Sequence, residues 1–278
     1  MIYREAMKLG ENILHMADVT DARTDAWLLL EQVCRIDRSF YYLHMEEDLA
    51  EEQLSEYKIA LKKRAEHVPL QYIIGETEFM GLKFKVNSNV LIPRQDTETL
   101  VEEALKVVTP GMHVLDLCTG SGCIIVSILH NVPQAEGTAT DISKQALLVA
   151  KENAKQNGVQ VNFERSDLFD AVTGVFDVIV SNPPYIPSGE VPKLMPEVRS
   201  FEPMEALDGR EDGLYFYRKI IASCPEYLKP GGRVLFEIGY DQGRAVSGLL
   251  EEAGFGEIRI VKDLAGNDRV VSGMLSQM

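Results

Sequence analysis

Apolar residues recur every three or four positions in the first part of the chain, the spacing of helices that bury one face. This periodicity predicts three helices, over residues 2–16, 21–35 and 50–66. Thr20 or Asp21 would open the second of them as a cap. The apolar run that starts at Trp27 fits the core of such a bundle. We therefore expect a small helical domain over residues 1–70.

The pattern then changes to the alternation of apolar and polar positions that is typical of strands. Residues 73–92 alternate around Gly81, with Phe79 and Leu82 on either side of it. A glycine between two alternating runs favours a β-hairpin. We expect residues 71–92 to form a hairpin linker between two domains.

Strand-like and helical stretches alternate over the remainder, residues 93–278. A helix is predicted over 96–108 and another over 123–130. Strands are expected at 111–117, 137–140, 161–164, 176–180, 232–238, 257–262 and 269–275. Such an alternation predicts an α/β domain built on a mostly parallel sheet.

The most informative stretch is Ser181–Tyr185, which reads Ser-Asn-Pro-Pro-Tyr directly after a buried strand. Two prolines cannot continue a strand because neither has an N–H group, so the chain leaves the sheet at its carboxyl edge, where open α/β sheets bind ligands. The Asn182 side chain and the free proline carbonyls are acceptors, and Tyr185 adds a flat ring. Together they suit a planar –NH2 group; a plain proline turn is the alternative.

A second feature is the tight loop Cys118–Gly122 between the strand that ends near Asp116 and an apolar helix. Its glycines allow a ligand to approach the backbone, and the helix N-terminus offers free N–H groups. Ile125 stands where a dinucleotide fingerprint has its third small residue, which counts against NAD. Asp141 ends the next strand, where it is placed to accept from ribose hydroxyls.

Asp167 and Leu168 follow the third strand of this series. A carboxylate and an apolar side chain there suit an adenine amine and an adenine face, although a loop-capping role for Asp167 is equally consistent. One acid or loop after each successive strand favours an adenosyl cofactor.

These residues resemble those of class I S-adenosylmethionine-dependent methyltransferases that methylate a planar nitrogen. More specifically, the chain resembles the HemK-type (PrmC) release factor glutamine methyltransferases almost end to end. Further stretches that carry this resemblance are 69–75, 79–84, 90–98, 202–203, 206–207, 212–214, 237–239 and 268–270. One departure is Cys118, where the family often has glycine, so the loop loses some freedom to adopt positive φ.

The resemblance implies a Rossmann-like, mostly parallel seven-stranded sheet whose last strand is antiparallel, with S-adenosyl-L-methionine as methyl donor. It also implies a substrate, the glutamine of the Gly-Gly-Gln motif in peptide-chain release factors. The expected donor-binding residues are Asp116, Cys118, Thr119, Gly120, Ser121, Gly122, Asp141, Asp167, Leu168 and Asn182. The expected substrate-binding residues are Asn182, Pro183, Pro184 and Tyr185, of which Asn182, Pro183 and Tyr185 are the expected catalytic residues.

Two alternatives remain open: a methyltransferase of adenine or guanine amines in nucleic acid, and a non-catalytic adaptor. Charge bears on the first of them. The net charge of −15 argues against an extended phosphate footprint, and the parts before and after residue 75 are both acidic. These sums leave room for a local basic patch, although no run of Lys or Arg marks one. The adaptor is disfavoured by the intact Asp141 and Asn182–Tyr185.

Cysteine and histidine usage bounds the rest. The four cysteines have no Cys-x-x-Cys spacing, which is typical of reduced thiols in a cytoplasmic protein, and the five scattered histidines predict no metal site. No signal peptide or 18-residue apolar run is visible. We expect a soluble, cytoplasmic monomer that binds neither membrane nor nucleic acid directly.

Overall fold

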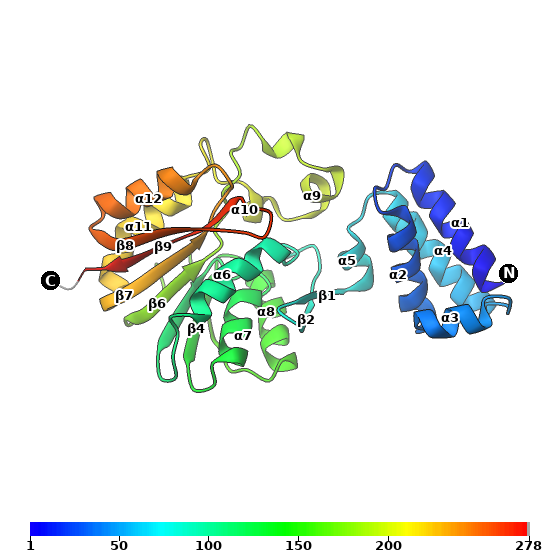
Figure 1. Ribbon diagram of the computed structural model, residues 1–278, viewed down its shortest axis with the longest axis horizontal. Helices are drawn as coiled ribbons and strands as arrows, with labels where there is room; N and C mark the ends of the chain where they lie inside the picture. The colour runs from blue at the N-terminus through cyan, green and yellow to red at the C-terminus, as the bar shows by residue number, and fades with distance from the viewer. Residues whose placement is uncertain (277–278) are drawn as a thin grey trace. The chain divides into compact units, whose positions relative to one another are not determined.

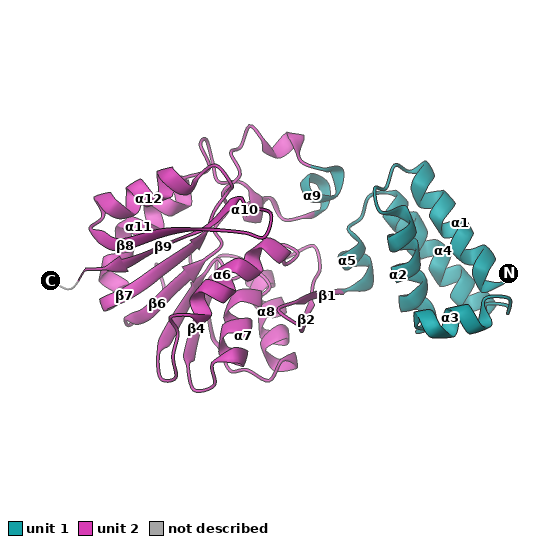
Figure 2. Cartoon of the chain, in the orientation of Figure 1, with its two compact units in different colours: residues 1–75, 195–201 teal, residues 76–194, 202–278 magenta. Residues whose placement is uncertain are grey.

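The computed structural model describes residues 1–276, and within them the chain forms two compact units (Figure 2). The N-terminal unit comprises Met1–Gly75 together with a later segment, Met195–Phe201. The C-terminal unit comprises Glu76–Leu194 and the chain from Glu202 onward. The return of residues 195–201 to the first unit was not expected from the sequence.

The N-terminal unit is helical, as expected (Figure 1). Its helices are α1 (Tyr3–Met16), α2 (Ala22–Cys34), α3 (Arg38–His44), α4 (Glu51–Ala65), α5 (Leu70–Ile74) and α9 (Pro196–Phe201). The sequence did not indicate α3, which is only seven residues long and is capped by Asp37, whose side chain accepts from Phe40 N at 2.7 Å. The core includes Tyr57, whose hydroxyl donates to Ala26 O at 3.0 Å.

A buried cation holds the returning segment within this unit. The Arg64 guanidinium forms ion pairs of 2.7 Å with Asp25 on α2 and with Glu197 on α9. Arg64 and Asp25 are both buried, so these contacts replace water that the two charges lose on folding. Glu197 thereby joins α9 to the helical core.

The C-terminal unit begins with an antiparallel hairpin of β1 (Glu76–Phe79) and β2 (Leu82–Lys85). It is shorter than the 71–92 expected, because Gly75 adopts a φ of +87° and ends α5 just before it. Met80 and Gly81 connect the strands, both with positive φ, as a two-residue turn requires.

The main sheet has seven strands in the order β5-β4-β3-β6-β7-β9-β8. The strands are β3 (His113–Leu117), β4 (Glu136–Asp141), β5 (Asn162–Arg165), β6 (Phe176–Ser181), β7 (Leu228–Glu237), β8 (Phe255–Lys262) and β9 (Asp268–Leu275). Neighbours from β5 to β7 pair in parallel, and β9 is antiparallel to both β7 and β8. This confirms the mostly parallel sheet with an antiparallel last strand.

Helices cover both faces of the sheet, each over its own hydrophobic core (Figure 1). One core includes side chains of α6 (Gln95–Leu105), α7 (Cys123–Asn131) and α8 (Lys144–Gln156); the other includes α11 (Tyr215–Tyr227) and α12 (Gly243–Glu252). A single-turn helix, α10 (Met204–Leu207), and a short 3-10 turn, Val191–Lys193, lie between β6 and α11 in the chain. The strand order reverses at β3, which makes the carboxyl ends of β3 and β6 the topological switch point.

Candidate active site

The strand register brings the sequence-predicted loops together at the switch point. Leu117 pairs with Thr140 on β4 and with Ser181 on β6, so three loops leave the sheet side by side. The Ser181 hydroxyl donates to Leu117 O at 2.7 Å and links the ends of β3 and β6. Cys118, Asp141 and Asn182 each directly follow one of these paired positions.

The loop after β3 turns tightly because three of its residues have positive φ, namely Cys118 (+59°), Gly120 (+55°) and Gly122 (+79°). Gly120 N donates to the Asp141 carboxylate at 2.9 Å, which holds the loop against the end of β4. Nothing lies within 4 Å of the place where a Cβ on Gly120 would stand, so its backbone faces open space. The loop therefore exposes the backbone of Gly120.

Cys118 carries a backbone conformation that normally belongs to glycine. A left-handed φ costs a residue with a Cβ about 1–2 kcal/mol. We expect Cys118→Gly to have a free energy of unfolding about 1 kcal/mol above that of Cys118→Ala, since both lack the thiol and only alanine keeps the strain. Urea unfolding of the two variants measures the difference. An alanine variant as stable as the glycine variant would show that the conformation is unstrained.

Asp116, on β3, holds this loop through a side-chain hydrogen bond. Its side chain is fully buried and accepts from the Thr119 hydroxyl at 2.6 Å. Burial, and to a lesser degree the Asp141 carboxylate, raises the pKa of Asp116 to about 7. Asp116 is not among the described residues that line the cavity introduced below, although the sequence suggested it as a donor contact.

Asp141 lies at the end of β4, where its two oxygens accept from Ser143 N at 2.8 Å and Gly120 N at 2.9 Å. Burial raises the pKa of this carboxyl, while the two backbone donors lower it. Each oxygen keeps a lone pair that these backbone bonds do not use. The side chain is thus oriented by the fold and still able to accept from a ligand.

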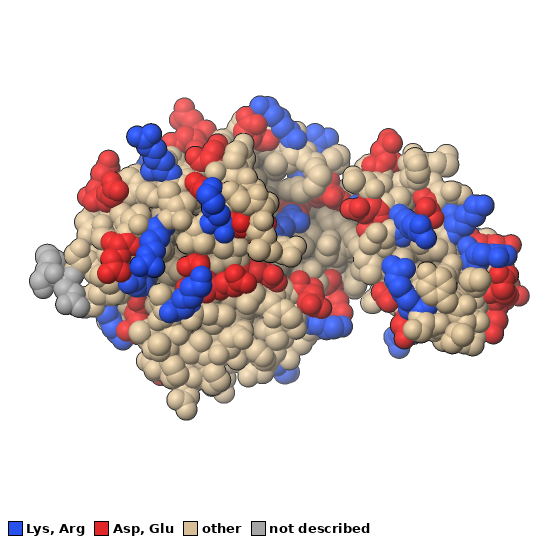
Figure 3. Space-filling view, viewed as in Figure 1, with Lys and Arg blue, Asp and Glu red and all other residues tan. Residues whose placement is uncertain are grey.

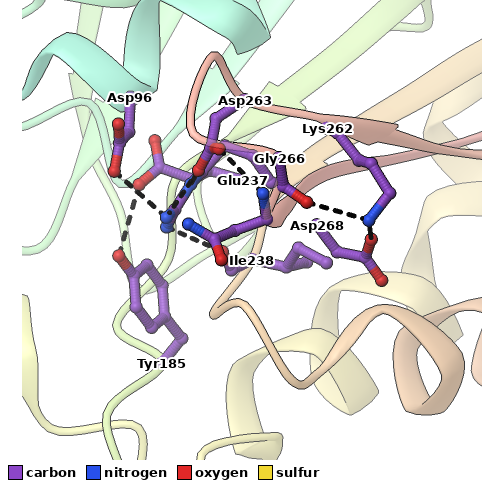
Figure 4. A network of polar contacts seen from close by, with 10 residues as sticks. Asp96, Tyr185, Glu237, Ile238, Lys262, Asp263, Gly266 and Asp268 are labelled. Atoms are coloured by element: carbon purple, nitrogen blue, oxygen red, sulfur yellow. Dashed lines mark hydrogen bonds and ion pairs between the residues drawn. The ribbon is translucent and has the colours of Figure 1, made fainter.

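Only two residues of the Asn-Pro-Pro-Tyr stretch line the cavity that lies beside these loops. Asn182 and Pro184 line the cavity, whereas Pro183 and Tyr185 are absent from its lining within residues 1–276. Asn182 Nδ2 lies 3.5 Å from Thr97 Oγ1 on α6, a long contact that leaves the side-chain oxygen free. The Tyr185 hydroxyl donates to Glu237 Oε1 at 3.3 Å, as Figure 4 shows, and its carbonyl accepts from Gln242 Nε2 at 2.9 Å.

The cavity has a volume of about 330 Å³. Sequence-predicted residues in its lining are Cys118, Thr119, Gly120, Ser121, Asp141, Asp167, Leu168, Asn182 and Pro184; Gly122 is absent from it. The lining also includes parts that sequence reasoning missed, among them Asn89–Leu91 with Pro93 and Thr97, the α10 segment from Pro203 to Ala206, and Tyr215, Phe216 and Lys219 on α11. An ion pair between Arg94 and the buried Glu202 holds the start of the α10 segment.

Acidic side chains slightly outnumber cationic ones in the lining of the cavity. The acids in its lining are Asp141, Asp167, Glu205 and Asp208, and the cations are Arg94, Arg210 and Lys219. The size, the mostly apolar wall and the few oriented polar groups match a site for a nucleoside-sized molecule. The residues present thus fit an adenosyl methyl donor.

Behind Tyr185 lies the buried carboxyl of Glu237 (Figure 4). Burial raises its pKa to about 7, against the opposing effects of Thr97, Arg269 and Tyr185, while the Asp96 carboxylate raises it further. Arg269 itself forms ion pairs with Asp263 at 3.1 Å and Asp96 at 3.0 Å.

Because the pKa of Glu237 is raised on folding, the folded protein keeps a proton that the unfolded chain loses from about pH 4.5 upward. Its contribution to the free energy of unfolding therefore falls as pH rises to about 7. We expect Glu237→Gln to gain stability relative to the wild type by about 1–3 kcal/mol between pH 5 and pH 8. Urea unfolding at both pH values tests this, with the exposed Glu226→Gln as control. A pH-independent difference would contradict it.

Metal ligands, membrane-spanning helices and cysteines bear on other classes of function. No group of three or more His, Cys, Asp or Glu side chains suited to a metal ion occurs in residues 1–276. No helix in that part of the chain is long and apolar enough to cross a membrane. The four cysteines are free thiols, and three of them are buried.

Comparisons with known proteins match both units. Residues 5–75 match the family model of the PrmC N-terminal domain, and residues 95–195 match that of the methyltransferase small domain. The release factor glutamine methyltransferase of Geobacter sulfurreducens is 42% identical over 98% of this chain and 96% of its own length. That of Cereibacter sphaeroides is 44% identical over 98% of both chains.

Among solved structures, a methyltransferase from Pyrococcus furiosus matches with a TM-score of 0.54 and 19% identity. The match covers 71% of this chain and 90% of that one. At this identity the likeness concerns the fold alone, and it agrees with the seven-stranded sheet described above.

Proposed function

The chain belongs to the family of release factor glutamine methyltransferases, and we propose that it transfers a methyl group from S-adenosyl-L-methionine to a glutamine side-chain nitrogen in peptide-chain release factors. The glutamine would be that of the Gly-Gly-Gln motif. The observation that carries the proposal is that Asn182, which directly follows β6, and Asp141, which ends β4, line one cavity of about 330 Å³ on either side of β3.

The donor would lie over the carboxyl ends of β3, β4 and β5. In this proposal Asp141 accepts from the ribose hydroxyls, the loop from Cys118 to Ser121 contacts the amino acid part, and Asp167 with Leu168 holds the adenine. The acids of the lining favour the donor's positive charge. What the donor supplies is a methyl group made electrophilic by the sulfonium.

The protein's main task at the acceptor is to position a poor nucleophile. An amide nitrogen attacks weakly because its lone pair is delocalised into the carbonyl. Asn182 Oδ1 and the Pro183 carbonyl would accept the two N–H hydrogens, fix the amide plane and raise electron density on nitrogen. No general base is required, since the methylated nitrogen is acidic and loses its proton to water. The Tyr185 ring would stack on the amide.

The helical unit would serve the protein substrate. The C-terminal unit holds every donor contact named above, which leaves residues 1–70 free to dock a release factor. Only a few residues of a protein substrate can enter a cavity of this size. A separate domain that docks the remainder of the substrate agrees with this limit.

Labelled donor separates this function from the alternatives. We expect the purified protein to methylate release factor and to leave tRNA, ribosomal RNA and DNA unlabelled. Label in a nucleic acid and none in release factor would favour the exocyclic-amine methyltransferase, and donor binding without label in either would favour an adaptor. Mass spectrometry of the labelled factor identifies the modified glutamine.

A further inference from the structure

A groove on the N-terminal unit gathers cations that lie far apart in the sequence. Side chains of α1, α2 and α3 line it, with a volume of about 500 Å³. Arg4, Lys8, Arg23 and Arg38 are in its lining, and Glu11 is the acid there. We call this the cationic groove. Figure 3 shows Lys and Arg side chains around an uncharged area on the face that carries α1 and α2.

The uncharged part of the cationic groove is aromatic. Trp27 is buried, with the Arg38 guanidinium 4.7 Å above its ring and Tyr41 edge-on at 5.3 Å between ring centroids. Tyr42 is 62% exposed, which is unusual for so large a ring. A fixed aromatic floor beside an exposed ring is typical of an interface centre, where aromatic and Arg side chains dominate binding.

Three of the four cations form no ion pair within residues 1–276. Arg4 pairs with Glu46 at 2.7 Å, and Arg38 stacks on Trp27. Lys8 and Arg23 are exposed, and neither forms an ion pair within residues 1–276. The chain has a net charge of −15, so most of its surface repels acidic partners. The cationic groove has surplus positive charge and attracts them.

We propose that the cationic groove binds an acidic segment of the release factor that also carries an apolar or aromatic side chain, an inference that rests on the function proposed above. The segment's carboxylates meet Lys8 and Arg23, and its apolar side chain packs on Tyr42. A short protein segment fits better than RNA because the chain carries a net charge of −15, and the segment needs to meet only the groove. A phosphate backbone that continues past the groove would meet the acidic remainder of the surface.

Steady-state kinetics with the full-length chain test this. Lys8→Glu combined with Arg23→Glu should raise KM for full-length release factor about five- to twenty-fold and leave kcat unchanged, since charges at a rim act on encounter and affinity. Donor affinity and turnover of a short peptide around the target glutamine should not change. The matched control is Lys58→Glu with Lys62→Glu, the same charge reversal at exposed positions of α4 outside the groove.

The outcomes separate the groove from the proposed function. If the wild type is active and the KM of the groove variant equals that of the control, the proposal that the cationic groove binds release factor is overturned. No methylation of release factor by the wild type overturns the proposed function instead. Should the double reversal reduce the melting temperature, Lys8→Gln with Arg23→Gln replaces it, and its KM should still rise about two- to five-fold.

Trp27 is the single tryptophan of the chain and reports occupancy directly. A tryptophan-free acidic peptide of about ten residues with one Phe should change its fluorescence in the wild type and not in the groove variant. A change caused by a short single-stranded RNA and not by the peptide would overturn the proposal in favour of a nucleic-acid partner.

Discussion

Asn182→Ala should reduce the rate of methyl transfer by about a hundred- to a thousand-fold, the loss of about 2.7–4 kcal/mol that follows removal of one preorganised hydrogen bond at a reacting centre. Without Oδ1, one N–H of the substrate amide has no acceptor and the amide rotates out of line with the donor methyl. Donor affinity should change little, because the proposed adenosyl contacts lie after β3, β4 and β5. Single-turnover transfer to release factor, with donor binding measured in parallel, gives both quantities.

Two further variants show whether acceptance of the N–H is what matters. Asn182→Asp keeps an acceptor of nearly the same shape and should retain more activity than the alanine variant. Thr97→Val removes the 3.5 Å contact to Asn182 Nδ2 and leaves Oδ1 in place, so it should cost far less. Near-normal transfer by Asn182→Ala would mean that the stretch is only a proline turn.

Asp141→Ala should weaken binding of S-adenosylmethionine by about 1.5–3 kcal/mol, the range for a hydrogen bond to a charged group. The structure adds a second reason, because the carboxylate also holds Gly120 N at 2.9 Å and its loss loosens the loop after β3. Calorimetry with donor measures the change. The control Asp170→Ala removes an exposed acid outside the cavity lining and should leave the affinity unchanged. Unchanged affinity in Asp141→Ala would remove this residue from the proposed donor site.

The parts of the site that the sequence predicted share one property: they directly follow strands. Asp141 ends β4 and Asn182 directly follows β6, and neighbouring parallel strands bring their carboxyl ends to one edge of the sheet. The α10 segment and Tyr215 follow no strand, and they reach the cavity through contacts such as Arg94 with Glu202, 108 residues apart. No local pattern encodes a contact of that separation.

Side-chain direction was a second limit. The sequence gives the ring of Tyr185 but not its direction, which depends on Glu237, 52 residues later, and on Gln242. The cationic groove is a similar case, because its cations come from three helices and form no run. The periodicity of a helix or strand predicts which of its faces is buried. It does not predict which exposed side chains of different elements come together.

The ion pairs of Arg64 determine how portable the helical unit is. A graft of residues 1–75 onto another catalytic domain would omit Glu197 and leave Arg64 with one of its two carboxylate partners. A buried cation that loses a partner destabilises the core around it. The transferable module is therefore discontinuous, Met1–Gly75 together with Met195–Phe201, and a recipient must supply that second segment from between its own β6 and α11.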